Sequence, residues 1–555
     1  MSESRPTLSE RRADALALHR EGDLLRAEQA YRAILETWPA DGETWHYLGV
    51  LCGQLERHRH ALECCVRAVG HGYVTAAVKS NMGQALLALG ETGQAITALR
   101  ESLALEPDNA DLSLQLADLL AGDGQEAGAI AVLSEAAERF ANDDRVQASL
   151  GELAARVLRP DLAEPAFRRA CEGGGAVPEN WLNLGSFLLM KGEREGAREA
   201  YRRALILDGS LDQAYWYLSQ VMDERDEALA GRILDRADSP ESRDSAALHF
   251  AAAHLLHRRA EHGPAFEHLR RGNRIRHAEL GNRAAADVDA VLRLSGASAG
   301  HAAASAVAAP LAEEPVPLFI VGLPRTGSTL IEQMLARHPA IDAGGENVWL
   351  QRHLRNLLRE RRLGFPEDQA RLSAADLTTL RERYLDSLRI RQRGGRFVTD
   401  KLPANFLCLP TIHCLFPDAV VIHARRDLLE ACWSCYRHLF TGGQAFTCDL
   451  EQLGRYALAV DSFMQSAARR RPDRIVTVEY DGLIADPRAV LVPVFDRLGL
   501  EWDEACRSPE AAAGMIQTAS ALQVREGLDA TPRRSAEAYL RFLEPLVQQL
   551  DRPDA

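Results

Sequence analysis

The 555-residue sequence has no apolar run of 18 or more residues, the length that a membrane-spanning helix requires. Its first residues, MSESRPTLSERR, lack the apolar core of a secretory signal peptide. The ten cysteines are irregularly spaced and form no recognisable disulfide framework. The formal net charge of −14 disfavours general binding to nucleic acids or anionic membranes. We therefore expect a cytoplasmic protein without a membrane span, in a reducing compartment.

Lysine is scarce, because only three of the 65 basic residues are lysines, at positions 79, 191 and 401. Abundant alanine and arginine together with few lysines fit a GC-rich, bacterial gene. Where arginine is the default cation, a single lysine is a candidate for chemistry that needs a compact ammonium group. Drift explains the same pattern nearly as well.

The first 210 residues repeat with a period of 34 residues and no insertion. Small residues recur in one column, at Ala27, Ala61, Ala95, Ala129, Ala163 and Ala197. Bulkier residues follow four positions later, at Tyr31, Cys65, Leu99, Leu133, Phe167 and Tyr201. Columns at i, i+4 and i+7 lie on one face of a helix, so each unit is expected to be a pair of packed helices.

This period and its small and large columns resemble the tetratricopeptide repeat (TPR), whose helix pairs stack into a superhelix. The resemblance implies a groove that binds a peptide or a partner protein. We assign residues 8–220 to about six repeats and residues 221–293 to capping or connecting helices. Residues 294–315 are rich in small residues and aperiodic, which is typical of a linker. Residues 316–552 then form a second domain.

The second domain opens with a short apolar run, a glycine-containing turn and a helical pattern, over residues 317–335. A strand, loop and helix in this order gather backbone N–H groups and a helix N-terminus at one place, which suits a phosphate-like anion. Gly322 and Gly327 have the spacing of the nucleoside-triphosphatase loop, but Ser328 stands where that loop has its lysine. A second strand, 419–423, leads into Arg425 and Arg426 without an aspartate for magnesium. These features weaken a kinase interpretation and favour an anion site without metal.

The loop Pro324-Arg325-Thr326-Gly327-Ser328-Thr329 resembles the 5′-phosphosulfate loop of sulfotransferases that use 3′-phosphoadenylyl sulfate (PAPS). Residues 418–440 resemble that family's second element, in which an arginine and a serine eight residues later hold the 3′-phosphate. The resemblance implies an α/β fold with a central parallel sheet and P-loop-like topology. It assigns the donor-binding role to seven residues of these two elements: Arg325, Thr326, Gly327, Ser328, Thr329, Arg426 and Ser434.

The subgroup that the chain resembles most is the protein-tyrosine sulfotransferases and similar TPR-fused enzymes. This resemblance implies that Glu346 is the catalytic base, that Lys401 and Arg325 stabilise the transition state, and that Ser520 assists. It also implies donor contacts for three further residues, Tyr480, Gln523 and Arg525. The family's tryptophan beyond this segment is missing, so the sequence does not tell whether Arg533 or Arg534 contacts the donor.

The sequence therefore predicts an all-α TPR superhelix followed by an α/β sulfotransferase domain. Its expected activity is the transfer of a sulfuryl group from PAPS, without a metal, to the tyrosine hydroxyl of a peptide or protein. A saccharide or small metabolite as acceptor is one alternative, and a TPR scaffold with an inactive transferase domain is another.

Overall fold

The computed structural model describes residues 6–173, 177–240, 244–298, 314–440, 442–509, 515–516 and 534–552. The chain divides into two compact units, Met1–Leu150 and Gly151–Ala555. The boundary falls inside α9 (Asp144–Arg156), so the repeats from Gly151 onward belong to the same unit as the α/β domain. No described helix is both long and apolar enough to cross a bilayer.

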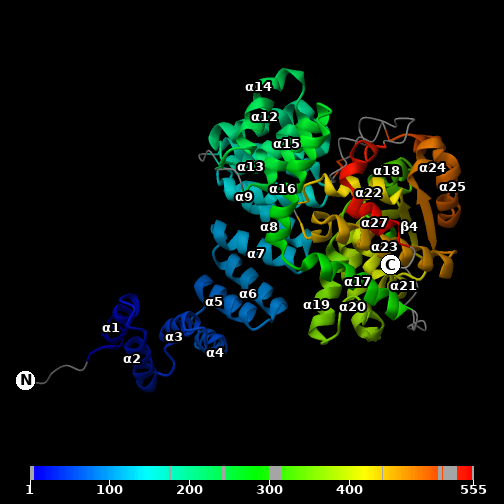
Figure 1. Ribbon diagram of the computed structural model, residues 1–555. Helices are drawn as coiled ribbons and strands as arrows, with labels where there is room; N and C mark the ends of the chain where they lie inside the picture. The colour runs from blue at the N-terminus through cyan, green and yellow to red at the C-terminus, as the bar shows by residue number, and fades with distance from the viewer. Residues whose placement is uncertain are drawn as a thin grey trace, which may run out of the picture. The chain divides into compact units, whose positions relative to one another are not determined.

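The first unit consists of consecutive helices that pack as pairs (Figure 1). They are α1 (Leu8–Arg20), α2 (Leu24–Thr37), α3 (Gly42–Gln54), α4 (His58–Gly70), α5 (Ala76–Ala88), α6 (Thr92–Leu105), α7 (Ala110–Gly122) and α8 (Glu126–Arg139). The glycine column of the repeats explains the close pairing. A Cβ atom on Gly83 would lie 2.8 Å from the Leu99 side chain of the next helix, so only glycine admits that leucine.

The same packing continues in the second unit, where a Cβ on Gly185 would lie 2.5 Å from the ring of Tyr201. The helices that precede the sheet are α10 (Pro160–Glu172), α11 (Pro178–Lys191), α12 (Arg194–Leu207), α13 (Asp212–Val221), α14 (Glu227–Ala237), α15 (Ala246–Arg258), α16 (His262–Leu280) and α17 (Arg283–Ser298). Helix α17 reaches Ser298, inside the range expected to be a linker, and its Leu294 is buried in the core.

A five-stranded, fully parallel sheet with the order β2-β3-β1-β4-β5 forms the centre of the α/β domain. Its strands are β1 (Val316–Gly322), β2 (Ile341–Asp342), β3 (Phe397–Asp400), β4 (Val420–Arg425) and β5 (Ile475–Glu479). Strands β1 and β4 are neighbours, and Gly322 pairs with Ala424. The chain leaves both strands at the same edge, where the strand order switches direction, which is the usual ligand position in such sheets.

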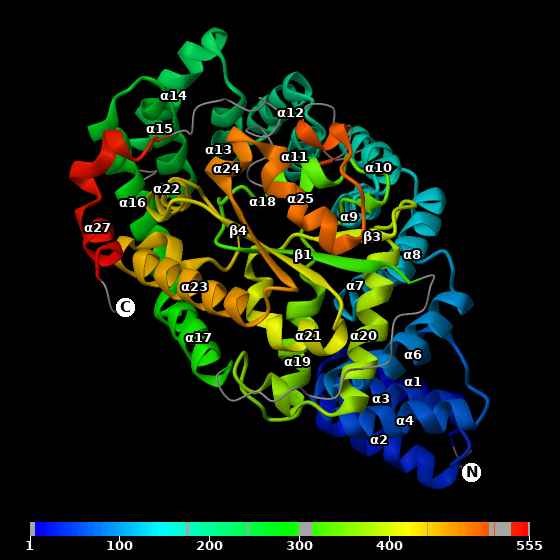
Figure 2. The same ribbon diagram turned by 90° about the vertical axis from the view of Figure 1, so that its right-hand side faces the viewer.

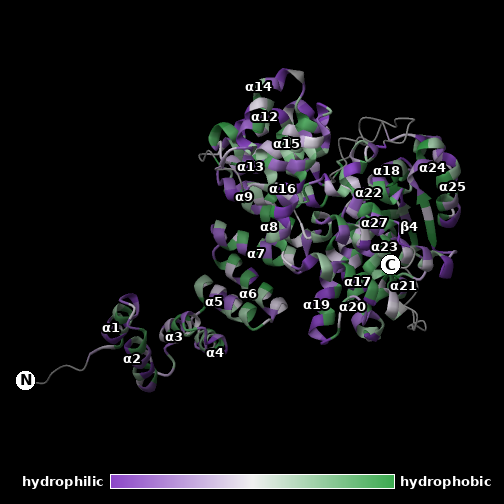
Figure 3. Cartoon of the chain, in the orientation of Figure 1, coloured by the Kyte–Doolittle hydropathy of each residue, from purple (hydrophilic) through white to green (hydrophobic). Residues whose placement is uncertain are grey.

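Both faces of the sheet are covered by helices (Figure 2), and the apolar residues of β4 are buried. The helices of the chain carry both hydrophobic and hydrophilic residues (Figure 3). Leu318 and Ile320 face a core with α18 (Ser328–Leu335) and α25 (Pro487–Leu498), whereas Phe319 and Val321 face the opposite core. The other helices of the domain are α19 (Trp349–Glu360), α20 (Ala374–Arg389), α21 (Leu409–Leu415), α22 (Leu428–Tyr436), α23 (Leu450–Arg470), α24 (Tyr480–Ala485) and α27 (Glu544–Leu550). The predicted fold class, a helical repeat array followed by an α/β domain with a parallel sheet, is confirmed.

One hydrophobic core joins the later repeats to the α/β domain within the second unit. Trp216 and Phe266 belong to the same buried cluster as Trp433. The rings of Phe266 and Phe542 stack with centroids 4.8 Å apart. Asn273 of α16 donates a hydrogen bond of 3.0 Å to the carbonyl oxygen of Tyr436 in α22. The repeats of this unit are therefore fixed against the α/β domain by packing and not by a chain connection alone.

Candidate functional site

The loop between β1 and α18 depends on two glycines for its shape. Gly322 has φ +139°, and a Cβ there would lie 2.6 Å from the carbonyl oxygen of Ala424. Gly327 has φ +90°, and a Cβ there would lie 2.6 Å from the ring of Tyr480. Thr326 holds the turn by donating a 2.8 Å hydrogen bond from its hydroxyl to the carbonyl oxygen of Leu323. The loop thus brings backbone amides to the N-terminus of α18, and its two glycines allow it to pack closely against β4 and Tyr480.

Ser328 and Thr329, the first two residues of α18, are buried. At this helix start, backbone N–H groups have no partner within the helix and carry partial positive charge. The structure places Thr326, Gly327, Ser328 and Thr329, for which the resemblance implies donor binding, at the N-terminus of α18. That role stays a prediction.

Arg325 connects this loop to the second predicted element. Its Nε donates a hydrogen bond of 3.0 Å to Oγ of Ser434 in α22. The Arg325 backbone has φ +68°, a left-handed conformation that is uncommon outside glycine. Burial, together with the positive charges of Arg437 and Arg426, lowers the pKa of Arg325 to about 10. Cations that destabilise one another in this way favour the binding of an anion.

Arg426 lies near the same loop, next to the ring of Tyr480. Its guanidinium group is 4.5 Å from the ring centroid of Tyr480, the ring against which Gly327 packs. Arg426 also lies 3.9 Å from the carboxylate of Glu430, one turn along α22. Arg325, Arg426, Ser434 and Tyr480 therefore converge on one place, although 155 positions separate the first of them from the last.

The neighbouring Arg425, the last residue of β4, is engaged elsewhere. Its guanidinium forms ion pairs with Asp461 at 2.6 Å and with Glu479 at 2.9 Å. Arg437 donates a 2.9 Å hydrogen bond to Nε2 of His257 in α15. Of the two adjacent arginines, Arg426 is thus the one beside Tyr480 and the loop.

Glu346 and Lys401 form an ion pair with a separation of 2.7 Å at the same edge of the sheet. The Lys401 side chain is 1% exposed, whereas that of Glu346 is 39% exposed. Two glycines explain how Glu346 reaches this position. A Cβ on Gly344 would lie 2.1 Å from the carbonyl oxygen of Thr399 in β3, and the Lys401 amide donates a 2.9 Å hydrogen bond to the carbonyl oxygen of Gly345.

A buried polar network beneath this pair is absent from the sequence-based predictions. Glu332 of α18 accepts hydrogen bonds from the hydroxyl of Thr399 at 2.6 Å and from the amide of Gly345 at 3.0 Å. Burial raises the pKa of Glu332. A glutamate at an otherwise apolar position of the helix was the available signal, since such a residue is seldom buried without partners.

Asp400 belongs to the same buried layer. It accepts hydrogen bonds from the hydroxyl of Tyr384 at 2.7 Å and from the side-chain amide of Asn405 at 2.9 Å. Burial raises the pKa of Asp400 to about 7. Asp400 directly precedes Lys401, so this network fixes the end of β3 from which the lysine extends.

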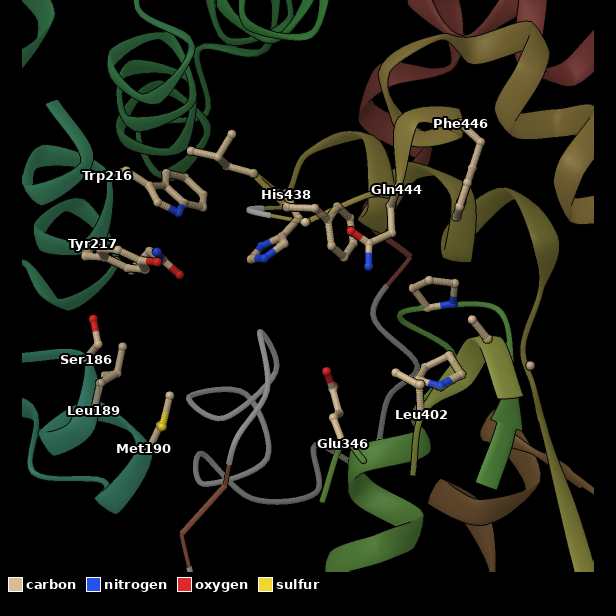
Figure 4. Close-up of a pocket in the computed structure, with 18 of the residues that line it drawn as sticks. Ser186, Leu189, Met190, Trp216, Tyr217, Glu346, Leu402, His438, Gln444 and Phe446 are labelled. Atoms are coloured by element: carbon tan, nitrogen blue, oxygen red, sulfur yellow. The ribbon is translucent and has the colours of Figure 1, made fainter. Parts of the chain in front are cut away.

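A cavity of about 360 Å³ opens beside Glu346. Gly322 and Pro324 line it, so the cavity adjoins the loop between β1 and α18. Its other lining residues come from the repeats and from the α/β domain: Ser186, Leu189, Met190, Tyr201, Trp216, Tyr217, Gln220, Leu402, Pro403, Ala404, His438, Leu439, Phe440, Gly442, Gln444, Phe446 and Tyr456. Figure 4 shows Glu346 pointing into this space. Its size is that of a site for a small molecule or a single side chain.

Ser520, Gln523, Arg525 and Arg533 lie outside the described residues. Arg534 is described, and it lies 3.7 Å from Glu537. The adjacent backbone is held to α22, because the amides of Ser535 and Ala536 donate hydrogen bonds to Glu430 at 3.1 and 3.0 Å. Across the described ranges, no three His, Cys, Asp or Glu side chains gather in a group that could hold a metal ion.

Comparison with known proteins agrees with this arrangement. Residues 317–504 match the sulfotransferase family, and residues 86–153 and 149–212 match tetratricopeptide repeats. An uncharacterized protein of Aquifex aeolicus (strain VF5) is 27% identical over 244 residues, which are 42% of this chain and 32% of the relative. Protein-tyrosine sulfotransferase 1 of Danio rerio is 26% identical over 222 residues, 38% of this chain and 61% of the relative.

The chain therefore spans less than two thirds of the length of either of these relatives. Among solved structures, MamA protein is similar over 30% of this chain and 90% of its own, with 23% identity and a TM-score of 0.28. The family matches and the fold together identify the protein as a chain of tetratricopeptide repeats followed by a sulfotransferase-family domain, with weak similarity to protein-tyrosine sulfotransferases.

Proposed function

We propose that the protein transfers a sulfuryl group from PAPS to the tyrosine hydroxyl of a peptide or protein. The observation that carries this proposal is the position of the Glu346–Lys401 pair. Glu346 lines a cavity that is also lined by the loop residues Gly322 and Pro324, and Arg325 of the same loop is bonded to Ser434. A base, an ammonium group and a cationic anion site thus meet at one sheet edge.

The residues at this edge fit a sulfonated adenine nucleotide. The α18 N-terminus and Arg325 would hold the 5′-phosphosulfate, and Arg426 with Ser434 would hold the 3′-phosphate. Gly327 supports this assignment, because its left-handed backbone lets the loop pack closely against the Tyr480 ring, which lies beside the Arg426 guanidinium. When bound, the donor supplies the sulfuryl group, and the chain's own residues supply positioning and charge.

Glu346 is proposed as the general base that removes the acceptor proton, a role worth about 10²–10⁴-fold in rate. Carboxylates are in general much weaker bases than phenolates, so removal of the acceptor proton has to accompany the attack on sulfur. Lys401 is proposed to neutralise the negative charge that develops on the leaving oxygen. Its burial strengthens that electrostatic effect, because little water surrounds the ammonium group.

The repeats are proposed to bind the polypeptide that carries the acceptor, or a partner protein. Helical repeat arrays present extended concave surfaces, which suit a peptide segment. The first unit contains a hollow of about 410 Å³ whose lining includes Trp45, His60 and Arg67. Its mixture of aromatic and charged side chains is compatible with a peptide ligand.

Incubation of the full chain with ³⁵S-labelled PAPS and three acceptors tests the proposal. The acceptors are a peptide with a single tyrosine, the same peptide with serine in its place, and an unsulfated oligosaccharide. We expect label in the tyrosine peptide and its loss in the Glu346→Gln variant. Label in the oligosaccharide alone would refute the tyrosine acceptor, and absence of transfer to all three, with PAPS bound, would refute catalysis of these transfers.

A further inference from the structure

Arg437, the residue directly after α22, lies three positions beyond Ser434. Residues three apart along a helix lie on the same face, so Arg437 follows the serine to which Arg325 donates its hydrogen bond. The Arg437 guanidinium has a partner outside the sulfotransferase match, because its Nη1 donates a 2.9 Å hydrogen bond to Nε2 of His257 in α15. A helix that precedes the sheet is thus in direct contact with the element assigned to the donor's 3′-phosphate.

The contact with Arg437 determines the protonation of His257. A guanidinium group has only N–H donors, so Nε2 of His257 has to be the acceptor and the ring proton has to lie on Nδ1. Nδ1 lies 2.9 Å from the hydroxyl oxygen of Tyr539, to which it donates. Burial and the charge of Arg437 lower the pKa of His257 to about 4, so the ring is neutral at pH 7. His257 therefore orients a cation without cancelling its charge.

Tyr539 holds His257 from the other side. The Tyr539 side chain is fully buried. Its ring centroid lies 4.2 Å from that of Trp433 and 4.9 Å from that of His262. A hydrogen-bonded chain from Tyr539 through His257 to Arg437 is thus fixed by packing at its far end.

Three arginines, Arg325, Arg426 and Arg437, influence one another at this edge of the sheet. Burial and the charge of Arg426 lower the pKa of Arg437. Burial and the charges of both other arginines lower the pKa of Arg325. The three guanidinium groups are therefore close enough to repel one another. An anion placed against Arg426 relieves this repulsion, and the positive field of Arg437 adds to its attraction.

Glu430 of α22 offsets part of this positive charge. Its carboxylate lies 3.9 Å from Arg426, and its charge raises the pKa of Arg437. The same carboxylate accepts hydrogen bonds from the amides of Ser535 and Ala536 at 3.1 and 3.0 Å. A single carboxylate, shared in this way with two amides, offsets the charge of one arginine and not of three.

We propose that Arg437 strengthens the binding of the donor's 3′-phosphate through its charge, and that His257 of α15 is the positioning residue that orients it. This inference rests on the proposed use of PAPS and adds a helix outside the sulfotransferase match to the donor site. A neutral acceptor suits this role, whereas Arg425 pairs with Asp461 and Glu479, whose carboxylates cancel its charge. A phosphate monoester carries about 1.5–2 negative charges at pH 7, so a further cation attracts it strongly.

Calorimetric titration of the full chain with adenosine 3′,5′-bisphosphate and with adenosine 5′-monophosphate tests the inference. The two nucleotides differ only in the 3′-phosphate, so the ratio of their Kd values isolates its contribution. We expect wild type to prefer the bisphosphate by about tenfold or more. Arg437→Gln should reduce this preference by about fivefold or more, with a smaller change in the Kd for the monophosphate. Arg437→Lys keeps the charge and should retain more of the preference.

Substitutions of His257 separate the orientation of Arg437 from its charge. His257→Gln keeps a neutral acceptor and should retain the preference for the bisphosphate, whereas His257→Leu should reduce it by about threefold or more. Thermal unfolding of each variant shows which of them are folded. Arg274→Gln is the matched control for the loss of charge, because Arg274 of α16 is exposed and its charge is screened by water and salt.

A folded Arg437→Gln variant with the wild-type preference would overturn the inference, and so would equal losses in Arg437→Gln and Arg274→Gln. If Arg437→Gln fails to fold, the two His257 variants decide, because equal preferences in His257→Gln and His257→Leu would also overturn it. Absence of any preference for the bisphosphate in wild type would instead refute the proposed use of PAPS, on which the inference depends.

Discussion

Replacement of Gly327 by alanine should weaken PAPS binding by about 2–30-fold, the loss expected when one cation–π contact of about 0.5–2 kcal/mol is disturbed. The new Cβ would lie 2.6 Å from Cδ2 of Tyr480, well inside the 3.4 Å at which ordinary van der Waals contact begins. The tyrosine ring has to move, and it is the ring that lies 4.5 Å from the Arg426 guanidinium. Displacement of the ring therefore disturbs the arginine assigned to the 3′-phosphate.

A second effect of this substitution is general and has to be separated from the first. Gly327 has φ +90°, where an alanine is strained by roughly 1–2 kcal/mol whatever surrounds it. Gly499 at the end of α25 has φ +65°, and a Cβ atom there would have no neighbour within 4 Å, so Gly499→Ala carries the strain without the collision. It is the matched control for the Tyr480 contact.

Calorimetric titration of both variants with PAPS and thermal unfolding of both decide the question. We expect both variants to lose Tm, because both alanines have left-handed backbones, and Gly327→Ala to lose more, because the collision with Tyr480 adds to the strain. A raised Kd for PAPS is expected only in Gly327→Ala. If Gly327→Ala bound PAPS as tightly as Gly499→Ala and wild type, the packing of Tyr480 against the loop would have no part in donor binding, and the assignment of this edge to the nucleotide would be refuted.

Other contacts lead to three more predictions. Lys401→Ala should lower kcat by about 10²-fold or more with little change in the Kd for PAPS, whereas Arg426→Ala should mainly raise that Kd. Kinetics and calorimetry measure the two quantities. A raised Kd in Lys401→Ala together with an unchanged Kd in Arg426→Ala would contradict the assigned roles. Asp400 has a folded-state pKa raised to about 7, so its contribution to stability is present at low pH and is lost as pH rises toward 7. Asp400→Asn should therefore flatten the fall in Tm between about pH 4 and 7, and an unchanged pH profile would refute the burial argument. Gly185→Ala should cost about 1–3 kcal/mol of stability in urea unfolding because its Cβ would lie 2.5 Å from a buried tyrosine ring. Gly231→Ala, with no atom within 4 Å, should stabilise by about 0.5–1 kcal/mol, and equal effects of the two would contradict the repeat packing.

The parts of the site that lie on short segments were predictable from the sequence. The loop from Arg325 to Thr329 follows a strand directly, and the distance from Arg426 to Ser434 is two helical turns. Periodicity likewise predicts the helix pairs, because small and bulky residues recur every 34 positions and lie four residues apart on one helical face. In each case the residues that define the feature are close together in the chain, so local patterns suffice.

The features that sequence patterns did not reveal depend on contacts between distant segments. Glu332 meets Thr399 only because α18 and β3 pack together, and nothing near Glu332 in the chain indicates that partner. The assignment of Trp216 to a cavity wall has the same cause, since its packing on His438 joins residues 222 positions apart. Repeat periodicity identifies such aromatic residues as core but does not distinguish those that also border a cavity.

The scarcity of lysine becomes informative only when burial is added to it. Each of the three lysines forms an ion pair: Lys79 with Glu101 at 2.5 Å, Lys191 with Glu164 at 2.6 Å, and Lys401 with Glu346 at 2.7 Å. Their side chains are 15%, 26% and 1% exposed, respectively, so Lys401 alone is almost completely removed from water. Because desolvation of an ammonium group offsets much of the attraction within a buried pair, stability gives little reason to keep a charge at position 401. The proposed sulfuryl transfer, which develops negative charge beside Lys401, would give such a reason. A compact ammonium group would meet that charge at a single point, whereas the planar guanidinium of arginine would need more room.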